Sequence, residues 1–209
     1  MKHCLLILGI VVMLAVGAPA YSQYIFMDVD GNGMCDGLDV ITSATTSVDI
    51  WIDTNHDAAG VMTTCPDAGS PPLDMFGYNV IVHAGGAGTV TYNGWSNAIA
   101  TWTVLEAFRS SGNDASVGFV APGAALAPGA YKVGSFSISA SGDPALSFLT
   151  NNSSLGGLGA PFTGFGGSCS GGGLLFVYDL GGDFSDACGT SAGTDVKSTT
   201  WGTIKNLYR

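Results

Sequence analysis

The chain has 209 residues, of which 46% are hydrophobic and only 11% are charged. This composition excludes a disordered acidic tail, because it supplies enough apolar side chains to build a core. Sixteen Asp and Glu against six Lys and Arg give a formal net charge of −10, which argues against nucleic acids and anionic membrane surfaces as partners. The 32 glycines favour turns and short strands, since each glycine weakens a helix by about 1 kcal/mol relative to alanine.

Residues 1–20 are predicted to be a signal peptide. A basic start precedes the apolar run LLILGIVVMLAV, which is shorter than the ~20 residues needed to span a bilayer. The small residues APA at 18–20 suit cleavage, so we expect a mature chain from about Tyr21, with no membrane span and an extracellular or cell-surface location. The alternatives are an uncleaved anchor and a lipoprotein, although Cys4 lies before the apolar run and not at its end.

A calcium-loop segment is predicted over residues 21–45. Within it, DVDGNGMCDGLD (28–39) has the ligand spacing of an EF-hand calcium loop, with Gly33 at the sixth position, where the chain must turn sharply. Alternate side chains of such a loop converge on one point, and clustered carboxylates repel one another until a cation binds. An acidic surface loop is the alternative. The predicted calcium ligands are Asp28, Asp30, Asn32, Asp36 and Asp39 through their side chains and Met34 through its backbone carbonyl.

The aspartate at the twelfth position, within LDVITS (38–43), makes this loop similar to the calcium loop of type I dockerin repeats. In dockerins the loop leads into a short helix whose first turn contains the last aspartate. The resemblance therefore implies a helix beginning around Asp39 and the same five side-chain ligands. This chain has one such loop near its start, whereas dockerins carry two, and Cys35 lies inside it.

A second aspartate-rich stretch, DTNHDAAG (53–60), repeats the D-x-N-x-D start but has Thr64 in place of an acid at the twelfth position. Residues Asp53 to Asp57 either add oxygens to a metal site or form an Asx-rich hairpin turn. The turn is the favoured interpretation.

Four cysteines follow the predicted signal peptide, and an even number in an exported chain indicates two disulfides. Three pairings are open. We favour Cys35 with Cys65 and Cys169 with Cys188, because each pair closes a short loop and could add about 2–4 kcal/mol. A zinc site is the alternative, but the chain has no CxxC spacing and only two histidines remain after the signal peptide.

Residues 46–196 are predicted to form an all-β, antiparallel β-sandwich. Apolar and polar side chains alternate with period two in SVDIWID (47–53), YNVIVH (78–83) and GSFSISA (134–140), as in half-buried strands. Short strands separated by turn signals are typical of a sandwich. Further predicted strands are GTVTYN, ATWTVLEAF, SVGFV, LSFL and LLFVYDL.

Two other stretches have distinct compositions. Residues 150–173 are rich in Gly and Ser and are predicted to form a long irregular loop; no GK[ST] follows the glycines, so phosphate binding is not favoured. In the tail 197–209, apolar residues from Trp201 to Tyr208 recur near helical spacing. They predict a short C-terminal helix packed on the sandwich, with a sorting or docking tail as the alternative.

The body resembles cohesin-like, jelly-roll and related carbohydrate-binding β-sandwich modules over residues 46–150. The segments that carry this resemblance are FGYNVIVHAGGAGTVTYN and LAPGAYKVGSFSISASGDPALSF. The resemblance implies noncovalent recognition at the cell surface, with an extracellular protein or a polysaccharide as the partner.

The expected function is therefore that of a secreted, calcium-binding recognition or structural module and not of an enzyme. The first alternative is a carbohydrate-binding module that stacks sugars on Trp51, Trp95 and Trp102, unless these rings fill the core. The second alternative is a metal-dependent hydrolase using Glu106 or His83. It is not favoured, because Glu106 is the only glutamate and no G-x-S-x-G motif occurs.

Overall fold

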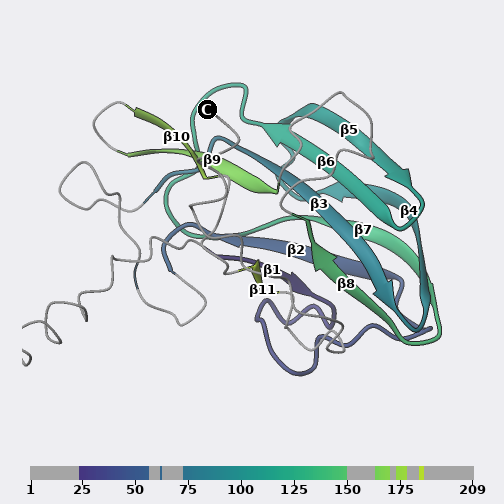
Figure 1. Ribbon diagram of the computed structural model, residues 1–209. Coiled ribbons are helices and arrows are strands. Elements are labelled where there is room, and N and C mark those ends of the chain that lie inside the picture. Colours follow the sequence, from purple (N-terminus) through teal and green to yellow (C-terminus); the bar gives the residue numbers. More distant parts are fainter. Residues whose placement is uncertain are drawn as a thin grey trace, which may run out of the picture.

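The computed structural model describes residues 24–56, 62, 73–149, 163–169, 173–177 and 184–185. These residues form eleven strands and contain no helix. The strands make two sheets that face each other across a shared core, so the predicted all-β sandwich is confirmed (Figure 1). The predicted signal peptide and the predicted C-terminal helix lie outside the described residues.

The first sheet has the strand order β11-β1-β2-β7-β4. Its neighbours pair antiparallel, except that the short β11 runs parallel to β1. The strands are β1 (Tyr24–Asp28), β2 (Ser47–Asp53), β4 (Thr89–Asn97), β7 (Ala130–Ser141) and β11 (Phe184–Ser185).

The second sheet has the order β10-β9-β3-β6-β5 and is antiparallel throughout. β8 also pairs with β3, so β8 and β9 follow each other along one edge of that strand. The strands are β3 (Gly77–Gly86), β5 (Thr103–Ser111), β6 (Asp114–Val120), β8 (Pro144–Phe148), β9 (Gly164–Cys169) and β10 (Gly173–Val177).

The core lies between the sheets and follows the predicted alternation. Val48, Ile50 and Ile52 of β2 are all 0% exposed, as expected for side chains that point to one face of a strand. On the facing sheet, Tyr78 and Val80 of β3 are buried in the same cluster.

The prediction of an irregular loop over 150–173 is wrong for its last third, because residues 164–169 form β9. A Cβ at Gly166 would lie 2.6 Å from the Phe76 ring, and one at Gly167 would lie 2.4 Å from the Asp74 carbonyl oxygen. Glycine is therefore needed for close packing here. A run of glycines carries no alternation from which a strand could be predicted.

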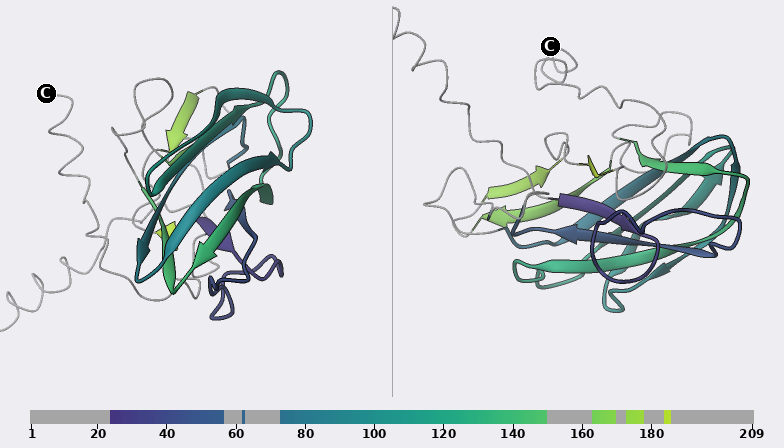
Figure 2. Two further views of the ribbon diagram at one scale, coloured as in Figure 1. Left: turned by 90° about the vertical axis from the view of Figure 1, so that its right-hand side faces the viewer. Right: turned by 90° about the horizontal axis from the view of Figure 1, so that it is seen from below.

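Residues 29–46 connect β1 to β2 and project from the first sheet (Figures 1 and 2). The helix implied after Asp39 by the dockerin resemblance is absent, so that expectation is wrong. The Val40 amide donates to the Leu38 carbonyl at 2.7 Å in a tight turn, and Ile41, 3% exposed, packs into the core. The chain has to turn back to pair β2 antiparallel to β1, which leaves no room for a helix to continue.

Candidate metal centre

Asp28 is the last residue of β1 and begins the loop. The pairing of β1 with β2 places it opposite Asp49, and its side chain is buried, with 1% of the residue exposed. Asp49 is neutralised separately, because Lys132 and Ser135 of β7 both donate to its carboxylate. The strand register thus fixes the first carboxylate of the loop at the edge of a rigid sheet.

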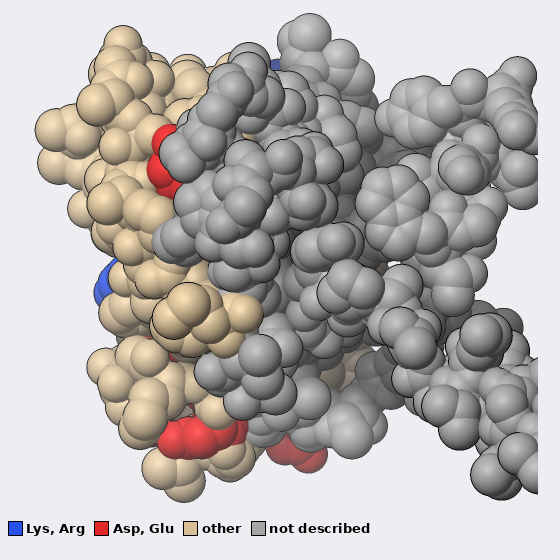
Figure 3. Space-filling view, turned by 90° about the vertical axis from the view of Figure 1, so that its left-hand side faces the viewer, with Lys and Arg blue, Asp and Glu red and all other residues tan. Residues whose placement is uncertain are grey.

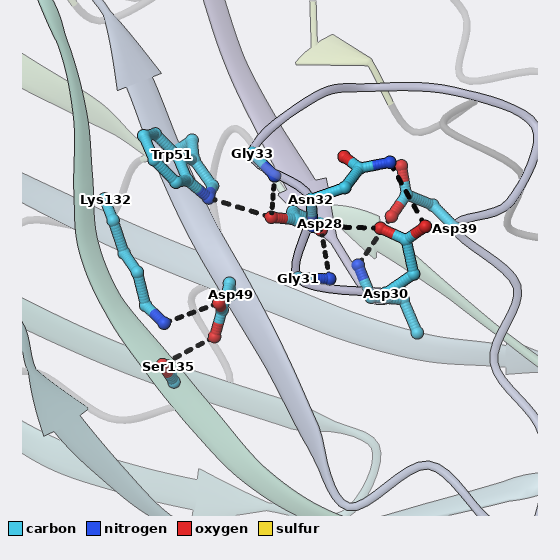
Figure 4. A network of polar contacts seen from close by, with 11 residues as sticks. Asp28, Asp30, Gly31, Asn32, Gly33, Asp39, Asp49, Trp51, Lys132 and Ser135 are labelled. Carbon is cyan, nitrogen blue, oxygen red and sulfur yellow. Dashed lines mark hydrogen bonds and ion pairs between the residues drawn. The ribbon is translucent and has the colours of Figure 1, made fainter.

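The loop wraps its backbone amides around Asp28. Gly31 and Gly33 donate to its two carboxylate oxygens at 2.7 and 2.8 Å, and Asn32 donates to the first of them at 3.2 Å. Both glycines have positive φ, +79° and +78°, a conformation that side chains disfavour. The indole Nε1 of Trp51 completes this set of donors at 3.1 Å (Figure 4).

Asp39, at the far end of the loop, is 0% exposed. Its two oxygens accept the amides of Val29 at 2.6 Å and Asp36 at 3.0 Å. Burial raises the pKa of Asp39, with the charge of Asp28 adding a smaller increase, while the backbone hydrogen bonds act in the opposite direction. A cation beside these carboxylates would favour their ionised form.

Asp28, Asp30 and Asp39 each contribute one carboxylate oxygen to a group whose members all lie within 4.8 Å of one another. The three ion pairs in the described part of the chain involve Asp49, Asp53 and Asp114, and none involves this group. Two buried carboxylates and a third beside them cost several kcal/mol to desolvate unless a positive charge offsets them. The cluster could therefore hold a metal ion.

The other predicted ligands take different roles in this structure. The Asn32 side-chain amide donates to Asp30 at 3.1 Å and to Asp36 at 3.0 Å, while its oxygen accepts the Met34 amide at 2.7 Å. Asp36 also accepts the Leu38 amide at 2.7 Å. Asn32 and Asp36 thus lie around the cluster, and Asp36 is not part of the carboxylate group.

Cys35, inside the loop, is a disulfide-bonded half-cystine. It is the one cysteine after the predicted signal peptide whose side chain is described, so its partner lies outside the described side chains. The pairings of Cys35 with Cys65 and of Cys169 with Cys188 stay predictions.

The candidate sugar-stacking tryptophans occupy three different settings. Trp102 is 6% exposed in the core, where it stacks on Tyr78 with 5.7 Å between ring centroids. Trp95 packs edge-on against the buried Phe136 at 4.6 Å. Trp51 is half-buried and stacks on Phe26 at 6.1 Å. Its bond to Asp28 was not foreseen; its position beside Asp49 on the outward face of β2 was the available sign.

The second aspartate-rich segment begins with a turn. The Asp53 carboxylate accepts the amides of Asn55 at 2.7 Å and His56 at 3.1 Å, and its other oxygen lies 3.0 Å from the His56 ring. This is the Asx geometry that was the favoured interpretation. Asp57 lies outside the described residues.

The described residues therefore define an all-β sandwich with a largely buried acidic triad at one end of its first sheet. Comparison with protein-family models, curated proteins and solved structures found no match to this chain. Within the described ranges, no helix has the length and apolar character needed to cross a membrane.

Proposed function

We propose that the chain is an exported β-sandwich module that binds a calcium ion in the loop 28–39 and acts outside the cell in noncovalent recognition or as a structural unit. The observation that carries the proposal is the convergence of Asp28, Asp30 and Asp39, two of them buried, with no cationic side chain paired to them in the described part of the chain.

The donor set favours a hard cation. All three carboxylates offer oxygen, and neither histidine nor cysteine joins the group, whereas zinc and copper prefer nitrogen and sulfur ligands. Calcium takes six to eight oxygens, so Asn32, backbone carbonyls and water would supply the rest. Asn32 can do so by turning its amide oxygen toward Asp30 and Asp36, where its nitrogen now lies.

An extracellular role agrees with the disulfide at Cys35, since disulfides persist in oxidising compartments. It also agrees with the predicted signal peptide. The loop lies between two paired strands of one sheet, and an ion that joins Asp28 to Asp39 would tie both ends of the loop to the sandwich. This arrangement suits a stabilising ion better than a calcium sensor, because the flanking elements are already held in the sheet.

Calorimetric titration with calcium of the protein expressed with its leader and purified after export tests this proposal. At least one site should appear, and Asp30→Asn should weaken it by at least about tenfold, because affinity depends on ligand charge. Asp30 is exposed, so this change leaves the core intact. Asp143→Asn, at an exposed aspartate in the turn between β7 and β8, is the matched control and should stay within about twofold.

Terbium, which replaces calcium in oxygen sites, gives a second measurement. Trp51 lies beside the site and should sensitise its luminescence. No calcium heat at millimolar concentration, or equal affinity in the Asp30→Asn variant, would refute the calcium site.

A further inference from the structure

The second sheet carries a group of polar side chains on the face turned away from the core. In β3 the core residues Tyr78, Val80 and Val82 alternate with Asn79 and His83. The latter two point to the opposite face of the sheet, because successive side chains of a strand alternate.

The neighbouring strands add polar groups to the same face. Gly118 of β6 lies opposite both Asn79 and Glu106. Ser116 lies opposite Arg109, and its hydroxyl donates to Glu106 at 3.4 Å. The set therefore spans three adjacent strands.

Next to this group, Asp114 of β6 pairs with His83 in the strand register. Its carboxylate lies 2.6 Å from His83 Nδ1.

One acceptor at the centre of this face is left unpaired. Asn79 is 7% exposed, and its side-chain oxygen has no hydrogen-bond partner in the part of the chain that the structure describes. That oxygen leans over Gly118, where a Cβ would lie only 2.2 Å from it and 3.3 Å from the Cβ of Glu106. A glycine within a strand commonly marks a place where a ligand or another backbone comes close, and a buried acceptor without a partner costs about 1–3 kcal/mol.

The polar face has a closed end and an open end. Glu106 and Ser116 are 8% and 3% exposed, whereas the side chain of His83 is 40% exposed. The surface of the described chain is otherwise sparsely charged, with acidic atoms in a few separate groups in the view of Figure 3. Glu106 is the only glutamate of the chain, so its burial beside an unpaired amide oxygen is unusual for this composition.

We propose that this face binds one unit of a neutral saccharide, with Asn79, Glu106 and Ser116 at the inner end and His83 and Asp114 at the open end. The unpaired Asn79 oxygen would accept a hydrogen bond from a sugar hydroxyl, and Gly118 would let the ring approach the backbone. This inference rests on the proposed recognition role and supplies its ligand.

The mixture of groups selects a neutral, hydroxyl-rich ligand. Glu106 and Asp114 bring negative charge, whereas Arg109 and a protonated His83 bring positive charge, so the face presents no single sign to attract an ion. Hydroxyl groups donate and accept together, which matches a set that contains an amide, a hydroxyl and carboxylates. Ile81, between Asn79 and His83 on the same strand, offers an apolar contact for the carbon face of a sugar ring.

A glycan array of neutral plant, fungal and bacterial oligosaccharides, probed with the full mature protein, provides the first test. Binding to at least one glycan is expected, and calorimetry with that glycan then gives the affinity. Glu106→Gln and Asn79→Ala should each weaken binding by about tenfold, the effect of losing a buried hydrogen bond. Thr91→Ala, at an exposed residue on the first sheet, is the control and should bind as the wild type does.

Each outcome decides the proposal. No binding to any neutral glycan at millimolar concentration would overturn it, as would wild-type affinity in both variants. If Asn79→Ala fails to fold, Glu106→Gln and the exposed His83→Ala decide instead. Asp30→Asn should keep glycan binding while losing calcium, so failure of the saccharide site and failure of the calcium site are separable.

Discussion

The indole Nε1 of Trp51 donates a hydrogen bond to Oδ2 of Asp28 at 3.1 Å, although 23 residues separate them. The Trp51 ring also stacks on Phe26, with the ring planes 7° from parallel, and its edge lies 3.4 Å from the Cβ position of Gly33. Trp51 therefore braces the acidic loop against β2 and holds one oxygen of the first carboxylate in place.

Trp51→Phe should weaken calcium binding by about five- to tenfold while leaving the fold intact. Phenylalanine keeps an aromatic ring beside Phe26 but cannot donate to Asp28, and hydrogen bonds to charged groups contribute about 1.5–3 kcal/mol when buried. Calorimetric titration measures the change. Trp95→Phe, at another half-buried tryptophan of the same sheet, is the control and should bind calcium as the wild type does. Equal affinities in all three proteins would show that Trp51 does not position Asp28.

Stability should depend on pH through Glu106. Burial raises the pKa of Glu106, while the hydrogen bond from Ser116 and the charge of Arg109 act in the opposite direction. A carboxyl group with a higher pKa in the folded chain stabilises the fold below its ordinary value of 4.5. That contribution is lost as the pH rises through the folded value.

The free energy of unfolding of the wild type, measured in urea, should therefore fall relative to Glu106→Gln as the pH rises above about 4.5. Asp143→Asn, at an exposed carboxylate, should run parallel to the wild type. A constant difference between wild type and Glu106→Gln across this range would contradict the prediction.

Thr163 closes a gap between β8 and β9 along β3. Its hydroxyl oxygen accepts the Ile81 amide at 2.9 Å and donates to the Leu149 carbonyl at 2.6 Å, and the residue is 0% exposed. Thr163→Val keeps the volume but leaves the Ile81 amide unpaired, so it should destabilise the fold by about 1–3 kcal/mol. Urea unfolding checks this change. Thr163→Ser retains the oxygen and should recover much of the loss, whereas equal losses in both variants would point to packing as the cause.

Two glycines of the first sheet should respond in opposite ways to alanine. A Cβ at Gly134 would lie 2.2 Å from the Trp95 ring and 2.5 Å from the Ser96 carbonyl oxygen, whereas nothing lies within 4 Å of the Cβ position of Gly94. Gly134→Ala should cost about 1–3 kcal/mol through overpacking. Gly94→Ala should be neutral or stabilise by up to about 1 kcal/mol, because it restricts the unfolded chain. Thermal melts compare them, and similar melting temperatures for both variants would contradict the packing seen here.

Local features of the sequence were sufficient for the sandwich and for the centre of the acidic loop. The alternation in 47–53 predicted the buried face of β2, because side chains of a strand point to opposite faces in turn. The spacing of Asp28, Asp30 and Asp39 predicted their convergence, because glycines between them allow the loop to curl. Both inferences depend on residues within a dozen positions of one another.

Contacts between distant segments were decided by the tertiary structure alone. β9 pairs with β3 across more than eighty residues, and its glycines fit beside Phe76 without any periodic signal. The donation from Trp51 to Asp28 and the meeting of Asn79 with Glu106 over Gly118 depend on strand register, which sets which residues lie side by side. A sequence shows which side chains can form a site, whereas strand pairing determines which of them meet.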